Sequence, residues 1–214
     1  MPIVALQMLE KKIERRIRLL ERKGSLRFLD EVAFIRHWID KPLSMGAVTP
    51  SGKMLARAMA RCVDPDVAGP VVELGSGTGA VTKALVERGV EPSRLVLVEF
   101  NPSFCRLLRT RYPDATVIQG DAYRIEHLLG SLLREKAAAL VSGLPLVTKP
   151  FKIRQRLMKE AFDLMVPGAP FVQFTYAMVT PIPKRAKHNI HAHASELIWQ
   201  NLPPARVWVY RKEA

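Results

Sequence analysis

The apolar and polar positions of this chain follow a regular order from residue 71 onward. Short runs that are almost entirely apolar alternate there with longer segments in which apolar residues recur every three or four positions. The short runs are typical of strands covered on both faces, and the longer segments are typical of amphipathic helices. This order predicts an α/β fold whose mostly parallel sheet lies between helices.

The residues between these segments set the expected ends of each element. Strands are expected at 71–75, 94–100, 115–121, 138–145 and 169–178, and helices at 80–89, 102–112, 123–136 and 150–165. Gly89 ends the first of these helices, and Pro102 stands in the first turn of the next, where each residue type is favoured. The last two segments, 195–200 and 205–212, flank the tetrapeptide NLPP and predict an antiparallel hairpin.

The first seventy residues have the helical period instead. The apolar residues of 1–24 form one stripe at steps of three and four, which consists of Leu6, Leu9, Ile13, Ile17 and Leu20. Lysines and arginines fill much of the remaining surface, and Gly24 ends this amphipathic helix. A second helix is expected over 26–39, and a third follows the loop GAVTPSG at 46–52.

The net charge of the chain indicates which class of partner it binds. The 214 residues include 33 lysines and arginines against 20 aspartates and glutamates, which gives a formal net charge of +13. This excess predicts an anionic partner, either nucleic acid or a membrane surface with acidic lipids. No run of eighteen apolar residues and no signal-peptide cleavage site is present, and Cys62 and Cys105 lack a metal or redox spacing. We therefore expect a cytoplasmic protein.

The stretch ELGSGTGA at 73–80 carries the clearest chemical signal. Gly75, Gly77 and Gly79 follow a predicted strand directly and precede a predicted helix. Glycines at such a turn let a ligand touch the backbone, and the N-terminus of the helix favours negative charge. The pattern alone also satisfies the dinucleotide fingerprint. A dinucleotide, a phosphate and another adenosyl cofactor all fit the loop taken by itself.

Three carboxylates around the loop distinguish these ligands. Glu73 lies two residues before the first glycine, where a carboxylate can meet the amino group of a bound amino acid. Glu99 ends the second strand, in a place suited to ribose hydroxyls, and Asp121 follows the third strand, in a place suited to an adenine amino group. Glu73 and Asp121 also fit simpler roles as helix caps. As a set with the loop, however, they resemble the class I S-adenosylmethionine-dependent methyltransferases over about 71–210.

This resemblance implies a Rossmann-like, mostly parallel sheet of seven strands, with S-adenosylmethionine as the cofactor and no metal. The implied cofactor-binding residues, besides the three carboxylates, are Met45, Ser51, Gly75, Ser76, Gly77, Gly79, Phe100, Asn101, Ala122, Ser142 and Leu144. The chain would then comprise a membrane-binding helix over 1–24, a helical cap over the active site at 25–69, and the cofactor-binding methyltransferase domain at 70–214.

Two families share this core, a basic charge and a Leu-Pro motif after the fourth strand. The rRNA adenine dimethyltransferases have an acidic or amide residue before the motif, which accepts from the target amine, and an aromatic residue after it, which stacks on the flipped base. Gly143 and Leu146 stand in these places here. The stretches SGLPL, GAVTPSG and NLPPARVWVYR instead resemble the bacterial phospholipid N-methyltransferases.

The second resemblance implies stepwise N-methylation of phosphatidylethanolamine, through its mono- and dimethyl forms, toward phosphatidylcholine. It implies a peripheral protein on the inner face of the cell membrane, with the 1–24 helix on the anionic lipid surface and no nucleic-acid partner. Two alternatives stay open. One is an rRNA adenine N6-methyltransferase, and the other is a non-catalytic membrane-binding module that retains the cofactor fold.

Tyr176 and His37 are the candidate catalytic residues. Tyr176 lies near the end of the fifth strand. Its ring could face an ammonium group by a cation–π contact, and its hydroxyl could accept a hydrogen bond from the amine. It could also be an ordinary core aromatic. The basic residues after this strand could bind the lipid phosphate or form a solvated loop, and they are Lys184, Arg185, Lys187 and His188. His191 and His193 suggest a metal, but no third ligand accompanies them.

Overall fold

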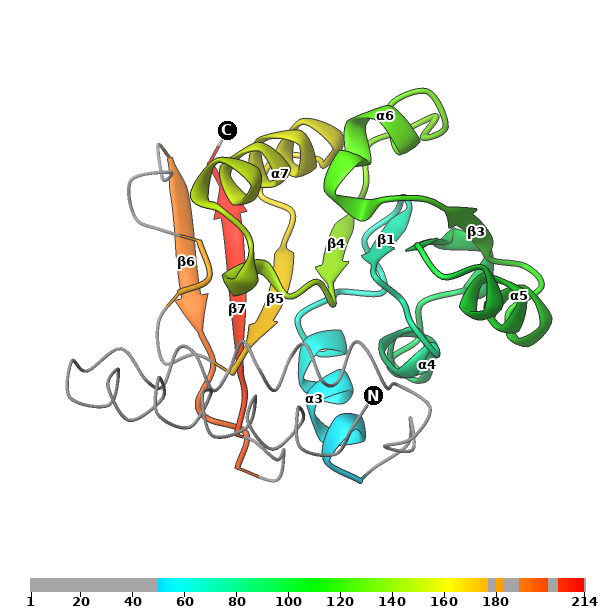
Figure 1. Ribbon diagram of the computed structural model, residues 1–214, viewed down its shortest axis with the longest axis horizontal. Coiled ribbons are helices and arrows are strands. Elements are labelled where there is room, and N and C mark those ends of the chain that lie inside the picture. The colour runs from blue at the N-terminus through cyan, green and yellow to red at the C-terminus, as the bar shows by residue number, and fades with distance from the viewer. Residues whose placement is uncertain (1–49, 177–179, 183–188, 200–203, 214) are drawn as a thin grey trace, which may run out of the picture. The chain divides into compact units, whose positions relative to one another are not determined.

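The computed structural model describes residues 50–176, 180–182, 189–199 and 204–213, which all lie in the compact unit Pro42–Ala214. Seven strands form one sheet in the order β3-β2-β1-β4-β5-β7-β6 (Figure 1). The strands are β1 (Val71–Leu74), β2 (Leu95–Glu99), β3 (Thr116–Gln119), β4 (Ala139–Ser142), β5 (Phe171–Thr175), β6 (Ile190–Ala194) and β7 (Arg206–Lys212). The predicted helices over 1–24 and 26–39 lie outside the described residues.

The helices follow the predicted alternation with the strands. The α-helices are α3 (Pro50–Ala60), α4 (Ala80–Glu87), α5 (Pro102–Arg111), α6 (Ile125–Leu129) and α7 (Phe151–Leu164). Three short 3₁₀ helices are η1 (Pro92–Arg94), η2 (Ala122–Arg124) and η3 (Leu146–Thr148). Strands β1 to β5 pair in parallel, and β7 runs antiparallel between β5 and β6. The predicted mostly parallel, seven-stranded fold is therefore confirmed.

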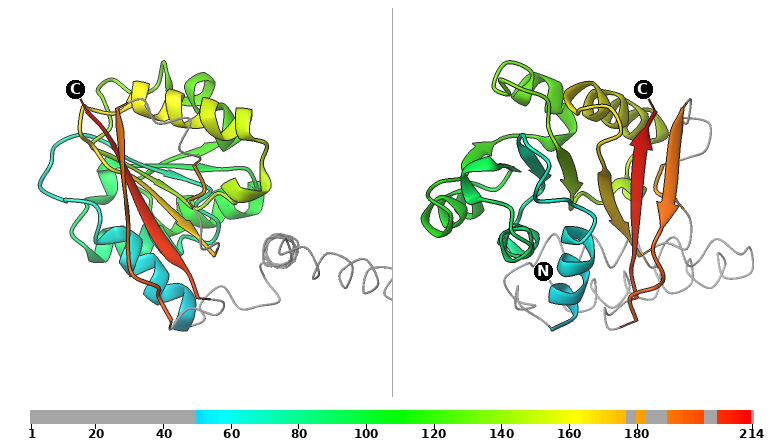
Figure 2. Two further views of the ribbon diagram at one scale, coloured as in Figure 1. Left: turned by 90° about the vertical axis from the view of Figure 1, so that its left-hand side faces the viewer. Right: turned by 180° about the vertical axis from the view of Figure 1, so that it is seen from behind.

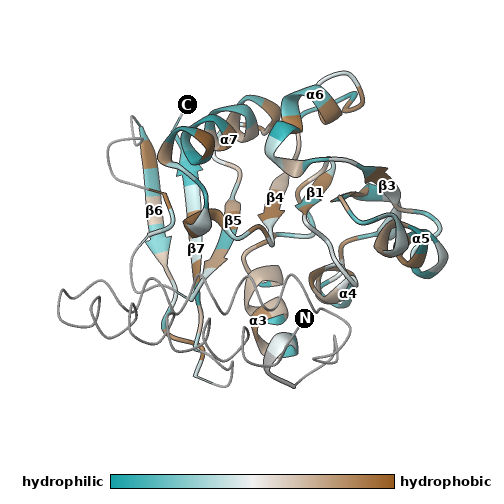
Figure 3. Cartoon of the chain, viewed as in Figure 1, coloured by the Kyte–Doolittle hydropathy of each residue, from teal (hydrophilic) through white to brown (hydrophobic). Residues whose placement is uncertain are grey.

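Both faces of the sheet carry a hydrophobic core, because successive residues of each strand point to opposite sides. In β1, Val71 packs with apolar residues of α3, α4 and α5, whereas Val72 and Leu74 pack with residues of α6 and α7. Helices α3 and α7 accordingly lie on opposite faces (Figure 2). Apolar residues dominate the central strands β1 and β4, while polar residues colour much of α5 and α7 (Figure 3).

The antiparallel pair at the C-terminal end differs from the predicted hairpin in its first strand. β7 pairs with β6. Within 195–199, the described part of the strand predicted at 195–200, Ile198 makes an isolated bridge to Ala205. β6 is an edge strand of sequence IHAHA, whose two histidines are exposed. Its small and polar residues give no apolar run, so the sequence pattern did not reveal it. His191 Nε2 lies 2.7 Å from Glu213 Oε1 across this edge.

The helix predicted over 123–136 is also shorter in the structure. A 3₁₀ turn leads into α6, which ends at Leu129, and the chain then crosses to the start of β4 without further helix. Ala137 N donates to Leu164 O at 2.8 Å, which ties this segment to the end of α7. Tertiary hydrogen bonds therefore override the helical pattern of 130–136. No helix among the described residues is long and apolar enough to cross a bilayer.

Candidate cofactor and active site

The glycine loop leaves β1 at the carboxyl edge of the parallel strands and leads into α4. Gly75, Gly77 and Gly79 have φ angles of 72, 55 and 84°, in the left-handed region that favours glycine. The loop is held against the neighbouring strand, since the amide nitrogen of Gly75 donates to Val98 O at 2.8 Å. The sharp turn between β1 and α4 therefore requires glycine at these positions.

One side of the loop touches the turn after β4, and another part of it faces open space. A Cβ atom on Gly143 would lie 2.9 Å from Gly75 O, and a Cβ atom on Gly75 would lie 3.0 Å from a methyl carbon of Leu144. A Cβ atom on Gly77, by contrast, would meet no atom within 4 Å. The backbone at Gly77 is thus bare and open, as a close-fitting ligand requires.

Two of the predicted carboxylates lie at the ends of the strands beside this loop. Glu99 is buried, and its two oxygens accept from Gly77 N at 2.8 Å and from Asn101 N at 2.7 Å. Each carboxylate oxygen has a second lone pair, which suits ribose hydroxyls. Asp121 is exposed and caps η2, because its Oδ1 accepts from Tyr123 N at 3.0 Å. No bond to its Oδ2 occurs among the described residues.

Glu73 is fully buried beneath the loop and does not cap a helix. Thr82 Oγ1 donates to Glu73 Oε2 at 2.6 Å. Burial raises the pKa of Glu73 to about 8, and the nearby Glu99 carboxylate raises that pKa further. The side chain is therefore largely protonated at neutral pH. An ammonium group bound beside it would favour the carboxylate and bring the pKa down.

We expect this protonation to couple cofactor binding to pH. Because the folded-state pKa lies above the unfolded value, stability from this group is complete below pH 4.5 and falls as pH rises toward 8. Binding of S-adenosylhomocysteine at pH 7 should release close to one proton, which calorimetry in buffers of different ionisation enthalpy measures. Glu73→Gln, which mimics the protonated form, should bind without release. Equal proton release in both proteins would contradict a Glu73–ammonium contact.

Further residues from the predicted set line the same edge. Ser76 Oγ is buried and has no hydrogen-bond partner among the described residues, so it offers an unused polar group inside the loop. Phe100 is 76% exposed directly after β2, where its ring can cover a flat base. Asn101 caps α5, and the remaining predicted residues here, Ala122, Ser142 and Leu144, are buried. An orphaned hydroxyl, bare glycine backbone and an exposed ring together fit an adenosyl group.

Several predicted residues are not brought together by the structure. His37, Met45 and the basic set Lys184, Arg185, Lys187 and His188 lie outside the described residues, and Ser51 belongs to α3 without a described side chain. Tyr176 is half-buried, and its ring meets Phe174 edge-on at 5.4 Å between centroids. It packs on the same core as α3 and α4. Its contact with a substrate stays a prediction.

Gln173 is a functional candidate that the pattern of apolar residues did not single out. It is fully buried in β5, beside Ser142 of β4 in the parallel register. Its Nε2 donates to Leu144 O at 2.9 Å and to Phe174 O at 2.8 Å, so it holds the turn that contacts the glycine loop. The sequence signal was one amide among the apolar residues Phe171, Val172 and Phe174 of the strand.

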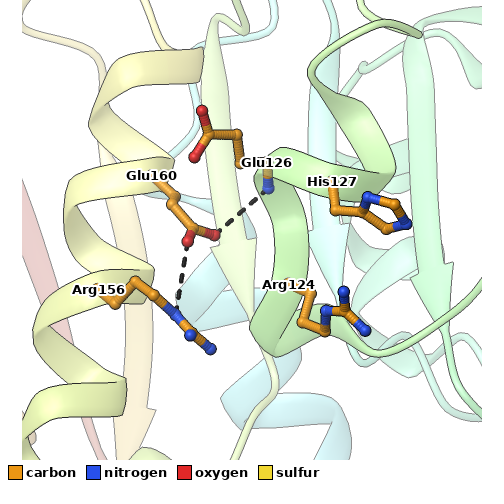
Figure 4. A pocket seen from close by; sticks show the side chains of 5 residues that line it. All are labelled: Arg124, Glu126, His127, Arg156 and Glu160. Carbon is orange, nitrogen blue, oxygen red and sulfur yellow. Dashed lines mark hydrogen bonds and ion pairs between the residues drawn. The ribbon is translucent and has the colours of Figure 1, made fainter.

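A separate pocket of about 280 Å³ lies between α6 and α7 (Figure 4). Glu160 bridges the two helices there, because it accepts from Glu126 N at 3.4 Å and pairs with Arg156 at 3.5 Å. Arg124 and His127 complete the lining. The ion pair in this pocket joins residues four apart on α7, which is typical of a helix surface. In the part of the chain that the structure describes, no three His, Cys, Asp or Glu side chains gather as a metal site.

The sheet order, the glycine loop after β1, the acidic residue that ends β2 and the acidic residue after β3 define the class I methyltransferase fold. The protein is an S-adenosylmethionine-dependent methyltransferase, and S-adenosylmethionine is its cofactor. A family model described as "Methyltransferase domain" matches residues 71–168. The O-methyltransferase of Bacillus cereus, solved in complex with S-adenosylhomocysteine, has a TM-score of 0.57 at 15% identity and covers 86% of this chain and 90% of its own.

Curated relatives and a further solved structure extend this comparison. The ornithine lipid N-methyltransferase of Singulisphaera acidiphila is 28% identical over 189 residues, 85% of this chain and 96% of that protein. The ribosomal RNA small subunit methyltransferase A of Synechococcus sp. is 33% identical over 95 residues, 43% of this chain and 31% of that protein. TrmN from Thermus thermophilus has a TM-score of 0.62 at 20% identity, and the alignment covers 81% of this chain and 52% of TrmN.

Proposed function

We propose that the protein methylates the amino group of a membrane lipid. The observation that carries this proposal is the extent of the match to the ornithine lipid N-methyltransferase, which spans 96% of that relative. The ribosomal RNA methyltransferase matches over 31% of its own length, so its likeness is confined to part of the protein. The lipid-modifying relative therefore resembles this chain in more than the shared cofactor-binding core.

The turn after β4 supports a lipid amine over an adenine base. An amide or acidic side chain at position 143 would place its Cβ 2.9 Å from Gly75 O, closer than real Cβ atoms approach. Leu146, at the place of the base-stacking aromatic, is 1% exposed and packs into the core with α7. Both groups that would receive a flipped adenine are thus missing from this turn.

Phosphatidylethanolamine is the substrate that the sequence resemblance favours, and an ornithine lipid is the second candidate. Both carry a primary amine near an anionic group, which is a phosphate in the first lipid and a carboxylate in the second. In our proposal the protein adds methyl groups to phosphatidylethanolamine and to its mono- and dimethyl forms. The helix over 1–24, outside the described residues, would hold the protein on acidic lipids by reversible insertion.

N-methylation requires the protein mainly to position an amine and to remove its proton. The cofactor supplies an electrophilic methyl group. An alkylammonium group has a pKa of ~10.4, so its deprotonation at pH 7 costs about 4–5 kcal/mol. A dry site lowers that pKa, because burial disfavours the charged form. The protein therefore has to exclude water at the carboxyl edge and hold the amine in line for transfer, and it needs no strong nucleophile.

We further propose that the Tyr176 hydroxyl relays the amine proton: its oxygen takes the proton from the ammonium group while its own hydroxyl proton passes to water. Tyr176→Phe keeps the ring on Phe174 and should slow the first methylation about 100-fold, within the range of a lost general base. Tyr176→Ala should be slower still, because it also loses the ring beside the core of α3 and α4. The rate with each lipid is the measurement, and Tm is the control. Wild-type rates in both variants would assign Tyr176 to the core alone.

One experiment tests the proposed function. The full chain is incubated with labelled S-adenosylmethionine and with vesicles of phosphatidylethanolamine and an acidic lipid, vesicles that contain ornithine lipid, or purified rRNA. Label should appear in mono-, di- and trimethylated phosphatidylethanolamine after chromatography. Label in ornithine lipid alone would change the substrate, and label in rRNA alone would replace the proposal.

Added salt should weaken vesicle binding without abolishing it, since charge attraction is screened and apolar insertion is not.

A further inference from the structure

Three buried polar atoms that have no hydrogen-bond partner in the described part of the chain lie on adjacent positions of β5 and β7. They are Gln173 Oε1, Trp208 Nε1 and Arg206 Nε. Gln173 stands directly opposite Trp208 in the antiparallel register, and Thr175 stands opposite Arg206. Opposite residues share a face of the sheet, as do alternate residues of one strand. The three side chains therefore share the face on which Trp208 packs with the core of α7.

The orientation of the Gln173 amide follows from its two bonds. Nε2 faces two carbonyl oxygens, those of Leu144 and Phe174, and carbonyl oxygens only accept. The nitrogen therefore has to point toward them, which leaves Oε1 as a buried acceptor that needs a donor. The bond to Leu144 O also places this acceptor beside the turn that touches the glycine loop. Gln173 is thus bonded directly to the turn that touches the glycine loop, at the edge of the sheet where we expect the cofactor.

Arg206 and Trp208 carry hydrogen-bond donors that lack an acceptor among the residues the structure describes. The indole N–H of Trp208 is a donor only, and the guanidinium of Arg206 is a cation with donors only. Arg206 has no carboxylate partner among the described residues. Both residues are half-buried, but Arg206 Nε and Trp208 Nε1 are themselves shielded from water, and such donors require an acceptor to offset their loss of water. One acceptor, Gln173 Oε1, and two donors, Trp208 Nε1 and Arg206 Nε, therefore stand near the cofactor edge without a partner among the described residues.

We propose that Gln173, Trp208 and Arg206 recognise the headgroup of the lipid substrate. Gln173 Oε1 accepts from the amine, while Trp208 Nε1 and the Arg206 guanidinium donate to the anionic group. This assignment rests on the proposed lipid N-methylation, and it states which headgroups qualify: those that carry an N–H donor beside anionic oxygens. The anion can be the phosphate of phosphatidylethanolamine or the carboxylate of an ornithine lipid, and both present the same complementary groups.

The Gln173 contact should weaken with each methyl group that is added. Methylation replaces N–H donors, so the unmethylated amine offers the most bonds to Oε1 and the dimethylated amine the fewest. Gln173→Met should therefore slow the first methylation more than the third, by a ratio of about tenfold. A purely structural role, through the lost bond to Leu144 O, would slow all three steps alike, and that result would overturn the role of Oε1.

The binding test uses short-chain lipids that dissolve as single molecules, so that membrane attachment does not enter. Calorimetry measures the affinity of dihexanoyl phosphatidylethanolamine, and in a second arm a short-chain ornithine lipid, for the complex of the full chain with S-adenosylhomocysteine. Trp208→Phe and Arg206→Gln should each weaken lipid binding about tenfold or more, as expected when a hydrogen bond to a charged group is lost. S-adenosylhomocysteine should bind each variant as it binds the wild type.

Trp199→Phe is the matched control, because it makes the same change at a side chain that is 71% exposed, and its lipid affinity should not change. Trp208→Phe also removes part of a ring that packs on the core and on Tyr210, so a modest fall in Tm is expected. Wild-type affinity for S-adenosylhomocysteine in this variant shows that the fold survives. Lipid binding without methylation by the wild type would support the headgroup site and reject the proposed function. If the wild type methylates lipid but Trp208→Phe and Arg206→Gln bind lipid as tightly as the wild type, the proposed function is supported and the headgroup site is rejected. If the wild type neither binds nor methylates lipid, both proposals are rejected.

Discussion

Gly77→Val is expected to remove S-adenosylhomocysteine binding while the fold survives. A Cβ atom at this position would meet no protein atom within 4 Å, so the new side chain would fill the open space where we expect the cofactor. Affinity should fall about 100-fold or more, which corresponds to about 2.8 kcal/mol. Isothermal titration calorimetry measures the loss, and circular dichroism with thermal melting reports on the fold.

Gly168→Val provides the matched control for this substitution. Gly168 has a φ angle of 77°, close to the 55° of Gly77, and a Cβ atom there also has no neighbour within 4 Å. Both variants therefore carry a similar backbone strain, of about 1–3 kcal/mol. Gly168 lies before β5, at the opposite edge of the sheet from the glycine loop. Equal cofactor affinity in the two variants would show that the loop is not the binding site.

Glu99→Gln should have the second largest effect, on cofactor binding and on stability together. The carboxylate accepts from two backbone N–H groups, those of Gly77 and Asn101, and an amide can accept only through its single oxygen. One part-buried N–H then loses its hydrogen bond to a charged acceptor, at a cost of about 1.5–3 kcal/mol. Because one of these bonds holds the glycine loop, S-adenosylhomocysteine affinity should also fall, by about 100-fold.

Glu87→Gln is the control for that loss of charge. Glu87 lies on the surface of α4, where its carboxylate pairs with Arg57 at 3.5 Å and with Lys83 at 3.7 Å. Exposed pairs of this kind contribute less than about 1 kcal/mol. Chemical denaturation should therefore separate the two variants clearly, and calorimetry should show wild-type affinity for Glu87→Gln. Unchanged cofactor affinity in Glu99→Gln would exclude Glu99 from the site.

Most of the fold could be predicted because hydrophobic period and breaker residues are local properties of the chain. β1, the glycine loop and α4 follow one another within twenty residues, and each is marked by its own residue types. The strand β6 was missed, since an edge strand of alternating histidine and alanine has no apolar run. The helix predicted to 136 ends at Leu129, because the segment that follows is tied to the end of α7 by the hydrogen bond from Ala137 N to Leu164 O.

The candidate site divides in the same way. The sequence pointed to Glu99 and Asp121 because both stand at strand ends, and parallel strands bring their carboxyl ends to one edge. It could not point to Gln173, Arg206 and Trp208 as a group. Gln173 and Trp208 are neighbours only because β7 inserts beside β5 in one particular register, and a shift of that register by one residue would turn Trp208 to the other face.

The sequence by itself determined the α/β order, the glycine loop and the cofactor class, because periodicity and residue types at strand ends express them within short stretches. Only the tertiary structure decided that β6 rather than 195–200 pairs with β7, that Gly143 closes against Gly75, and that the Gln173 amide faces Leu144 O. The physical reason is that hydrogen bonds and close contacts between distant segments fix these features. Their partners become neighbours only when the whole sheet has formed.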